Sequence, residues 1–461
     1  MQENDTISAI STPLGEGGIG IVRLSGPDAF AVADRIFDCP KNSDPGFPEP
    51  RRLYYGHIRD NDGEIIDEVL VSYMPAPHTY TREDIVEINC HSGILTLRAI
   101  LRIVLNSGAR LAEPGEFTKR AFLKGRIDLS QAEAVMNIIR ARSEEAVKIA
   151  ARTLQGDLAG KVGRVREELI DLRAPLEAWF DYPEEFSGDI PGSDRIKLKL
   201  HELQKVLQDL VQGVERSRAY QEGVSVAIIG RPNVGKSSLL NALLRQQRAI
   251  VHEIPGTTRD MLEGNMNLGG YPISLVDTAG IQGTEDPVEQ QGIERSRAAA
   301  ERARLLVVVL DGSSPWTQED AEIAGLRNPD QGLVVVINKV DLEQKIPAAT
   351  VKKIFTDAEI VKTAALTGVG IDLLEEAVTR QLDLVLGTTG ESPLLVSIRH
   401  EEIIRGAMLN IENAIYAVDT QPLELVSLEL QIAWNLLGEI TGETVTEPLL
   451  DKIFSEFCLG K

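Results

Sequence analysis

The sequence predicts a multidomain fold in which an α+β N-terminal domain precedes an all-α helical domain that carries an inserted α/β domain. Short apolar runs broken by turn residues fill the first quarter of the 461 residues, apolar residues then recur at helical spacing, and continuous β-branched runs follow before the helical spacing returns. The expected ranges are 1–119 for the N-terminal domain, 120–217 and 381–461 for the helical domain, and 218–380 for the inserted domain. At roughly 150 residues per domain, the length also suggests about three domains.

Each element follows from its local pattern. In the N-terminal domain, Ile19–Leu24 and Ile85–Ile88 are expected to be strands and Leu95–Val104 a helix. In the next region, apolar residues form one helical stripe that predicts a packed helix; they are Ile196, Leu200, Leu203, Leu207, Leu210 and Val214.

The inserted domain is predicted from apolar runs that alternate with helical stretches. The runs are Val224–Ile229, Ile273–Val276, Leu305–Leu310 and Leu333–Ile337. Continuous β-branched runs of this kind are typical of a parallel sheet that is buried on both faces. Helices are expected again over Ile403–Ala417 and Leu423–Leu437, so helical regions flank the sheet on both sides and indicate an insertion.

Composition excludes several classes of function. The net charge of −22 argues against a sequence-independent phosphate binder, and 5% aromatic residues argue against a stacking platform for single-stranded nucleic acid. Three cysteines without a CxxC pair predict neither disulfides nor a zinc site. The start of the chain lacks a signal-peptide pattern and no long apolar run follows, so we expect a reduced, cytoplasmic protein.

A nucleotide-binding loop follows the first buried strand of the inserted domain. Gly230–Ser238 reads GRPNVGKSS, which fits GxxxxGK[ST] between a strand and a helix. Main-chain amides of such a loop surround the β-phosphate, the lysine reaches the β- and γ-phosphates, and the serine hydroxyl ligates Mg²⁺. The residues expected at the nucleotide are Asn233, Val234, Gly235, Lys236, Ser237 and Ser238, with Ser237 as the Mg²⁺ ligand.

Two further motifs follow strands in the order required for a GTPase. The γ-phosphate motif after Ile273–Val276 is Asp277, Thr278, Ala279 and Gly280. The base-specifying motif after Leu333–Ile337 is Asn338, Lys339, Val340 and Asp341, whose carboxylate accepts from the N1 and amino group of guanine but finds no such pair on adenine. The loop of Ala364, Ala365 and Leu366 is expected to offer a main-chain amide to guanine O6.

The segment between these motifs supplies a switch threonine and lacks a glutamine. Thr258 is expected to bind Mg²⁺ and the γ-phosphate from a segment that comprises His252, Glu253, Ile254, Pro255, Gly256, Thr257 and Thr258. Ras-type GTPases orient the attacking water with a glutamine directly after the DTAG glycine, but Ile281 stands there. The residue pattern leaves the acidic candidates open; they are Glu285, Asp286, Glu289 and Glu294.

The motifs together resemble one family over the whole chain. GRPNVGKSS, GTTRD, DTAGI and NKVD are similar to the Era- and Der-type GTPases. The opening DTISAI with GGIGIVR, the internal PGEFTKRAF and DLSQAEA, and the final FCLGK resemble the MnmE (TrmE) family of tRNA-modification GTPases. This resemblance implies modification of C5 of the wobble uridine of certain tRNAs, with a tetrahydrofolate one-carbon unit and the flavoprotein MnmG. It also implies a homodimer formed through the N-terminal domain and K⁺-dependent pairing of the inserted domains.

The resemblance also assigns residues. It implies that Glu289 orients the attacking water and that K⁺ is bound by Asn233, His252, Ile254 and Thr257, so that the cation replaces an arginine finger. It implies a folate site of Arg23, Glu87, Arg126 and Lys461. Cys458 is either a nucleophile near the one-carbon unit or a packed thiol. The alternatives to this function are a ribosome-assembly GTPase of the Era or Der type and a nucleotide-gated scaffold.

Overall fold

The computed structural model describes residues 5–39, 49–60, 62–181, 192–250, 266–275, 300–356, 358–387, 394 and 396–460. The chain forms two compact units, one of Met1–Met136 with Trp434–Lys461 and one of Asn137–Ala433. The first and last parts of the chain therefore belong to the same unit. The four-part division expected from the sequence stays a prediction.

The first unit contains a seven-stranded sheet with the order β3-β4-β5-β6-β2-β1-β7. Neighbouring strands are antiparallel except for β1 and β7, which run parallel. The strands are β1 (Ile7–Ile10), β2 (Gly20–Ser25), β3 (Phe37–Asp38), β4 (Leu53–Arg59), β5 (Ile65–Met74), β6 (Ile85–Cys90) and β7 (Arg110–Leu111). The predicted strands near residues 19 and 85 correspond to β2 and β6.

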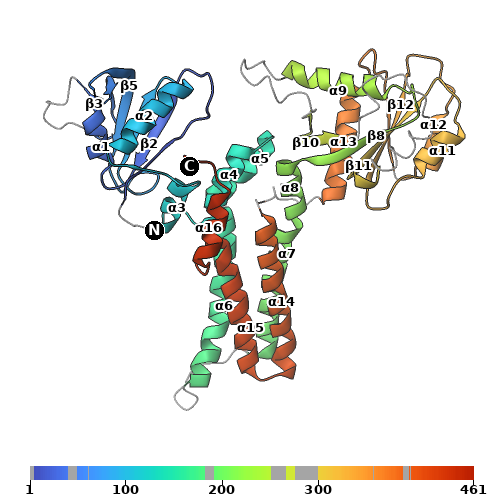
Figure 1. The fold of residues 1–461 in the computed structure, drawn as a ribbon. Coiled ribbons are helices and arrows are strands. Elements are labelled where there is room, and N and C mark those ends of the chain that lie inside the picture. The colour runs from blue at the N-terminus through green and yellow to red at the C-terminus, as the bar shows by residue number, and fades with distance from the viewer. Residues whose placement is uncertain are drawn as a thin grey trace. The chain divides into compact units, whose positions relative to one another are not determined.

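Helices α1 (Ala29–Ile36) and α2 (Ile94–Asn106) share one core with this sheet (Figure 1). Val32, Leu97 and Ile100 are fully buried there with Val22 and Ile88 of the central strands. The apolar spacing along α2 places its buried residues on one face, as the sequence predicts. The α+β prediction for this region is confirmed.

A second core of the first unit joins residues that are far apart in the sequence. Helices α3 (Glu116–Leu123) and α4 (Leu129–Arg140) pack with α16 (Glu447–Ser455). Ala121 and Met136 are buried there with Leu450, Phe454 and Phe457. The final residues continue onto the first strands, where Gly115 N donates to Cys458 O at 3.3 Å and Ser11 Oγ to Gly460 O at 3.0 Å.

The second unit has a helical part and an α/β part. Long helices run beside one another in the helical part (Figure 1). The helices are α5 (Glu144–Leu154), α6 (Asp157–Asp181), α7 (Ser193–Gln212), α8 (Val214–Glu222), α14 (Ile398–Thr420) and α15 (Leu423–Thr441), of which α15 continues from Trp434 as part of the first unit. The stripe predicted as one helix through Val214 is divided, because α7 ends at Gln212 and Val214 begins α8 after Gly213.

The α/β part is a six-stranded sheet with the order β13-β12-β11-β8-β10-β9. All neighbours are parallel except β9 and β10. The strands are β8 (Val224–Ile229), β9 (Met266–Leu268), β10 (Tyr271–Leu275), β11 (Leu305–Asp311), β12 (Gly332–Asn338) and β13 (Glu359–Lys362). Every residue of β11 and β12 is buried, so the predicted parallel sheet is confirmed.

Helices connect these strands; they are α9 (Lys236–Ile250), α11 (Gln318–Ala324), α12 (Ala348–Ile354) and α13 (Ile371–Leu386). The sheet lies between helical segments that precede residue 224 and follow residue 386, which agrees with a multidomain fold with an inserted α/β domain. Within the described ranges, no helix combines the length and the apolarity needed to cross a membrane.

Candidate functional site

The predicted nucleotide loop connects the carboxyl end of β8 to the amino end of α9. Asn233 and Gly235 both have positive φ, 63° and 102°. A Cβ on Gly235 would lie 2.3 Å from Nδ2 of Asn338, so only glycine fits against that side chain. The loop is therefore shaped by a close approach of the base-specifying motif on β12.

The side chain of Lys236 turns back onto the main chain of the predicted phosphate-binding loop. Its Nζ donates to Gly230 O at 2.7 Å and to Arg231 O at 2.8 Å. Burial lowers the pKa of this lysine because the charged form loses hydration. The ammonium therefore lies among main-chain carbonyls at the centre of the loop, and a bound phosphate would replace these carbonyls as its partner.

Asn338 links three segments through one side-chain amide. It is 2% exposed. Its Nδ2 donates to Val234 O at 2.9 Å, and its Oδ1 accepts from Ala365 N and from Thr363 Oγ1, both at 3.1 Å. The phosphate-binding loop and the predicted O6-contacting loop are thus held by the same residue.

Lys339 extends along the phosphate-binding loop. Its backbone has a φ of 63°, and its Nζ donates to Asn233 O at 2.8 Å and to Asp311 Oδ2 at 2.7 Å. Burial alone would raise the pKa of Asp311, but hydrogen bonds from Lys339 and Ser313 outweigh it and lower that pKa. The side chain is therefore fixed with its stem beside the loop, which suits the predicted covering of the base.

The base-contacting residues lie at the same edge of the sheet. Asp341 is exposed, Ala364 is buried and Leu366 is 86% exposed. Val340 N donates to Thr363 O at 3.1 Å, which joins the NKVD segment to the loop after β13. The structure therefore brings together the phosphate loop, the NKVD motif and the Ala364–Leu366 loop, as their positions at strand ends predict.

Three residues of this site, Asp311, Arg231 and Asp320, are not among the predicted site residues. Asp311, which anchors Lys339, ends the buried strand β11, so a polar residue at the carboxyl end of a parallel strand was the available signal. The Arg231 Nε lies 2.7 Å from Asp320 Oδ1, and the side chain of Asp320 is only 1% exposed. Nothing in the sequence pairs these two residues, because 89 positions separate them.

Other predicted site residues lie outside the described residues. They are His252, Glu253, Ile254, Pro255, Gly256, Thr257, Thr258, Asp277, Thr278, Ala279, Gly280, Glu289 and Lys461. Asn233 and Ser237 are described, and the assigned K⁺ and Mg²⁺ roles of all these residues stay predictions. Within the described ranges, no group of three or more His, Cys, Asp or Glu side chains could hold a metal ion.

Three of the residues predicted to bind folate, Arg23, Glu87 and Arg126, lie on the first unit. The Arg23 Nη2 and Nε atoms are each 2.8 Å from Glu87 Oε1, on the neighbouring strands β2 and β6. The Arg23 guanidinium also lies 5.7 Å from the ring centre of Phe117 on α3. Both charged side chains are partly exposed, at 17% and 24%, so a ligand could reach them.

Two further residues of the predicted folate site, Arg126 and Cys458, have surroundings that differ from those of the Arg23–Glu87 pair. The Arg126 guanidinium lies 4.7 Å from the ring centre of Tyr80, and Tyr80 Oη is 2.9 Å from Thr118 Oγ1 of α3. Cys458 is exposed, whereas Cys39 and Cys90 are buried. Burial raises the pKa of Cys90 to about 11, so that thiol stays protonated at neutral pH.

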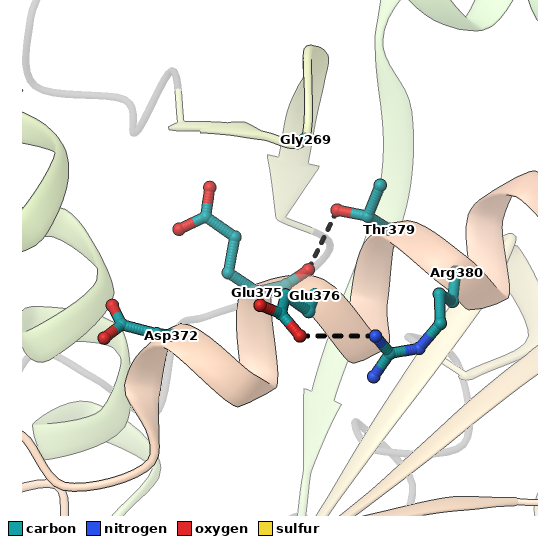
Figure 2. Close-up of a pocket in the computed structure, with 6 residues that line it drawn as sticks. All are labelled: Gly269, Asp372, Glu375, Glu376, Thr379 and Arg380. Carbon is teal, nitrogen blue, oxygen red and sulfur yellow. Dashed lines mark hydrogen bonds and ion pairs between the residues drawn. The ribbon is translucent and has the colours of Figure 1, made fainter.

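A pocket of about 440 Å³ lies away from all of these predicted residues. Figure 2 shows its lining, which comes from the turn between β9 and β10 and from α13. The lining residues are Gly269, Asp372, Glu375, Glu376, Thr379 and Arg380. Arg380 contacts Glu376 at 3.3 Å, and the remaining carboxylates give the pocket an acidic lining with no sign of a nucleotide site.

Two protein families match the chain. The MnmE helical domain matches residues 129–458, and the family described as GTP-binding protein TrmE N-terminus matches residues 6–126.

Curated relatives match along their entire length. A protein of Bacillus velezensis named tRNA modification GTPase MnmE is 45% identical over 99% of this chain and 100% of its own. A protein of the same name from Alkaliphilus oremlandii is 44% identical over 100% of both chains. Among solved structures, a point variant of Aquifex aeolicus Era bound to GDP.AlF4- is 25% identical, covers 41% of this chain and 67% of its own, and has a TM-score of 0.26.

Proposed function

The chain belongs to the MnmE family of tRNA modification GTPases, and from this premise we propose that it hydrolyses GTP while it takes part in modifying C5 of the wobble uridine of certain tRNAs. The observation that carries the proposal is the hydrogen bonding of Asn338 and Lys339. These two residues join the phosphate-binding loop to the segments that would read guanine. Nucleotide binding and base selection would therefore occur in one rigid site.

Protein groups would orient the nucleotide as follows. Main-chain amides of 233–238 would donate to the β-phosphate, and Lys236 would exchange its carbonyl partners for phosphate oxygens. Asp341 would accept from guanine, while Lys339, fixed by Asp311, would cover the base. Glu289 would orient the attacking water, since Ile281 has no polar group for that purpose.

Two cations complete the proposed site. Ser237 and Thr258 would hold Mg²⁺, and Asn233, His252, Ile254 and Thr257 would hold K⁺. Asn233 is exposed, and its main-chain carbonyl already accepts from Lys339, so its side-chain oxygen is the atom that suits a hard cation. The cations supply positive charge where the β–γ bond breaks.

The first unit would bind the tetrahydrofolate one-carbon donor. Glu87 can accept from the N–H and amino edge of a pterin, and Arg23, Arg126 and Lys461 can bind carbonyl or carboxylate groups. The stacking of Arg23 on Phe117 and of Arg126 on Tyr80 holds both guanidinium groups near α3. Cys458 would lie at this site as a nucleophile or a packed thiol.

The proposed partners are a second copy of the chain, tRNA and the flavoprotein MnmG, in the cytoplasm. The domain ranges 1–119, 120–217, 218–380 and 381–461 are part of the same proposal. The dimer would form through the N-terminal domain, and GTP with K⁺ would bring the inserted domains together.

Mass spectrometry of tRNA wobble uridines, with and without the gene for this chain, tests the proposal. We expect the C5 modification to disappear with the gene and to return when the gene is restored. If the level of C5 modification does not change when the gene is absent and the ribosomal subunit profiles do change, the ribosome-assembly alternative would be favoured.

A GTPase assay tests the cation assignment separately. Turnover should rise strongly in K⁺ and fall in Na⁺ at equal ionic strength, and Asn233→Ala should remove most of this difference while GDP still binds. Equal rates in the two salts would contradict the K⁺ site.

A further inference from the structure

Two tyrosines stack where the helical part of the second unit passes into the sheet. Tyr220 lies on α8, and Tyr271 is the first residue of β10. Their ring centres are 4.2 Å apart and their planes differ by 8°. They are 7% and 0% exposed, so the stack is an internal contact between a helix and a strand.

The hydroxyl of Tyr271 extends this contact to a third element. It donates to Asp383 Oδ1 on α13 at 2.8 Å, and Arg216 Nη2 of α8 lies 3.5 Å from the same oxygen. The Arg216 guanidinium also lies 5.9 Å from the ring centre of Tyr220. Burial and the neighbouring Asp383 raise the pKa of Tyr271, so its hydroxyl remains a donor. We call Arg216, Tyr220, Tyr271 and Asp383 the tyrosine junction.

The hairpin turn before Tyr271 fits tightly between helices. Gly269 and Gly270 have φ values of 58° and 90°. A Cβ on Gly269 would lie 2.1 Å from Thr379 Oγ1 of α13, and one on Gly270 would lie 3.1 Å from Glu145 Cγ of α5. Figure 2 shows Gly269 beside Thr379, whose hydroxyl donates to Glu375 O at 2.8 Å. The amino end of β10 is thus held by α5, α8 and α13.

The elements of the junction are also those that enter and leave the sheet. Gly223 connects α8 directly to β8, and β8 ends at the phosphate-binding loop. Strand β10 pairs in parallel with β8, with Ile273 opposite Val224, and the chain after β10 reaches Asp277. Helix α13 returns the chain toward α14. Strand β10 leads to the γ-phosphate motif. The hydrogen bond from Tyr271 to Asp383 connects this strand to α13, where the chain leaves the sheet, and the stack of Tyr271 on Tyr220 connects it to α8, where the chain enters the sheet.

We propose that the tyrosine junction couples the nucleotide state to the helical part, with Tyr271 as a positioning residue. A shift of β10 on loss of the γ-phosphate would change the Tyr271–Asp383 hydrogen bond and the stack on Tyr220, and so displace α8 and α13. Tyr271 contacts no reacting group, so its effect is on the transmission of the change and not on hydrolysis. This inference rests on the proposed GTPase function.

Hydrogen exchange of the full chain tests the junction without an assay of tRNA modification. Amide exchange in α8 and α13 should differ between the GDP-bound and the GTP-analogue-bound protein. Tyr271→Phe removes the hydroxyl but keeps the ring stack, and it should reduce this difference about tenfold. Asp383→Asn should do the same, and the double variant should add little, because both changes remove one interaction.

Tyr416→Phe is the matched control, because Tyr416 lies on α14 and is 68% exposed. It should leave the exchange difference unchanged. Wild-type protein with no nucleotide-dependent difference in α8 and α13 would overturn the inference. An undiminished difference in Tyr271→Phe would overturn it equally.

The yield of modified tRNA per GTP hydrolysed distinguishes this inference from the proposed function. In Tyr271→Phe, GTP turnover should stay near the wild-type rate while the yield falls about tenfold. Wild-type protein that modifies no tRNA would contradict the proposed function alone. A normal yield in Tyr271→Phe beside an active wild type would contradict the junction alone.

Discussion

At the scale of single residues, the nucleotide site depends on side chains that serve two segments at once. Asn338 holds the phosphate loop and the Ala365 amide, and Lys339 holds the phosphate loop and Asp311. Each of these two side chains therefore bonds to the phosphate loop and to a second segment at the same time. Asp341 differs from them, since it is exposed and free to meet a base.

Asp341→Asn should change the base preference. The amide can donate where the carboxylate only accepts, so preference should move from guanine toward xanthine, whose C2 carbonyl accepts that donor. Competition of GTP and XTP for the nucleotide site measures the change. Unaltered affinities for both nucleotides would mean that the base is read elsewhere.

Asp311→Asn should weaken nucleotide binding without changing base preference. The substitution keeps the shape but removes the charge that holds Lys339, and we expect about tenfold weaker GDP affinity. Titration with a fluorescent GDP measures this. Asp330→Asn, at an exposed position before β12, is the control and should bind GDP normally; equal affinity of the two variants would exclude a role for the anchor.

At the scale of elements, α3 organises a network of partly buried charged side chains in the first unit. Arg120 of this helix contacts Asp5, Glu83 and Glu116, and Arg110 also contacts Asp5 and Glu116. Burial alone would raise the pKa of Asp5 and Glu116, but hydrogen bonds from the two arginines outweigh it and lower both. Their stabilising effect is therefore present at neutral pH and is lost as the pH falls below about 4.

Arg120→Met should destabilise the first unit by about 3 kcal/mol at pH 7, because it removes the arginine from the buried Glu83 and leaves the buried Glu116 with Arg110 alone. The pKa of Glu116 should then rise, so the loss of stability should be smaller at pH 5 than at pH 7. Thermal unfolding at both pH values measures the difference. Arg102→Met, at an exposed position on α2, should have little effect at either pH; equal losses at both pH values in Arg120→Met would contradict the network.

Local sequence patterns predicted most of the helices and strands, but they did not predict contacts between residues that are far apart in the sequence. Strand β8 matches its predicted range, because a strand that is buried on both faces of a parallel sheet consists of a continuous apolar run. The stripe through Val214 was wrong in one respect, since periodicity does not show that Gly213 separates α7 from α8. The contacts of Arg231 with Asp320 and of Tyr220 with Tyr271 depend on tertiary packing, which no spacing encodes.

At the scale of the whole molecule, the final residues bind the start of the chain. Gly460 has a φ of 90°, a Cβ there would lie 2.2 Å from Ile10 O, and Ser11 donates to the Gly460 carbonyl. These contacts hold in place a segment that would otherwise fray.

Deletion of Leu459–Lys461 should abolish tRNA modification and weaken 5-formyl-tetrahydrofolate binding by about tenfold or more. K⁺-stimulated GTP hydrolysis should remain nearly unchanged, because the nucleotide site lies in the other unit. Isothermal titration beside a GTPase assay measures both effects. Ser11→Ala, which removes one hydrogen bond to the tail, should weaken folate binding less; normal folate affinity in the truncated protein would refute the shared site, and a parallel loss of GTP hydrolysis would indicate misfolding.

The shared core of α3, α4 and α16 also has a consequence for synthesis on the ribosome. Ala121 and Met136 are translated roughly 300 residues before their partners Leu450 and Phe454, which at about 5–20 residues per second is a delay of ~15–60 s. During that interval the apolar face of α3 and α4 has no permanent cover, while the intervening unit can already fold. The nascent chain should therefore pass through a stage in which this face is a target for chaperones, and the first part to be made should be the last to be completed.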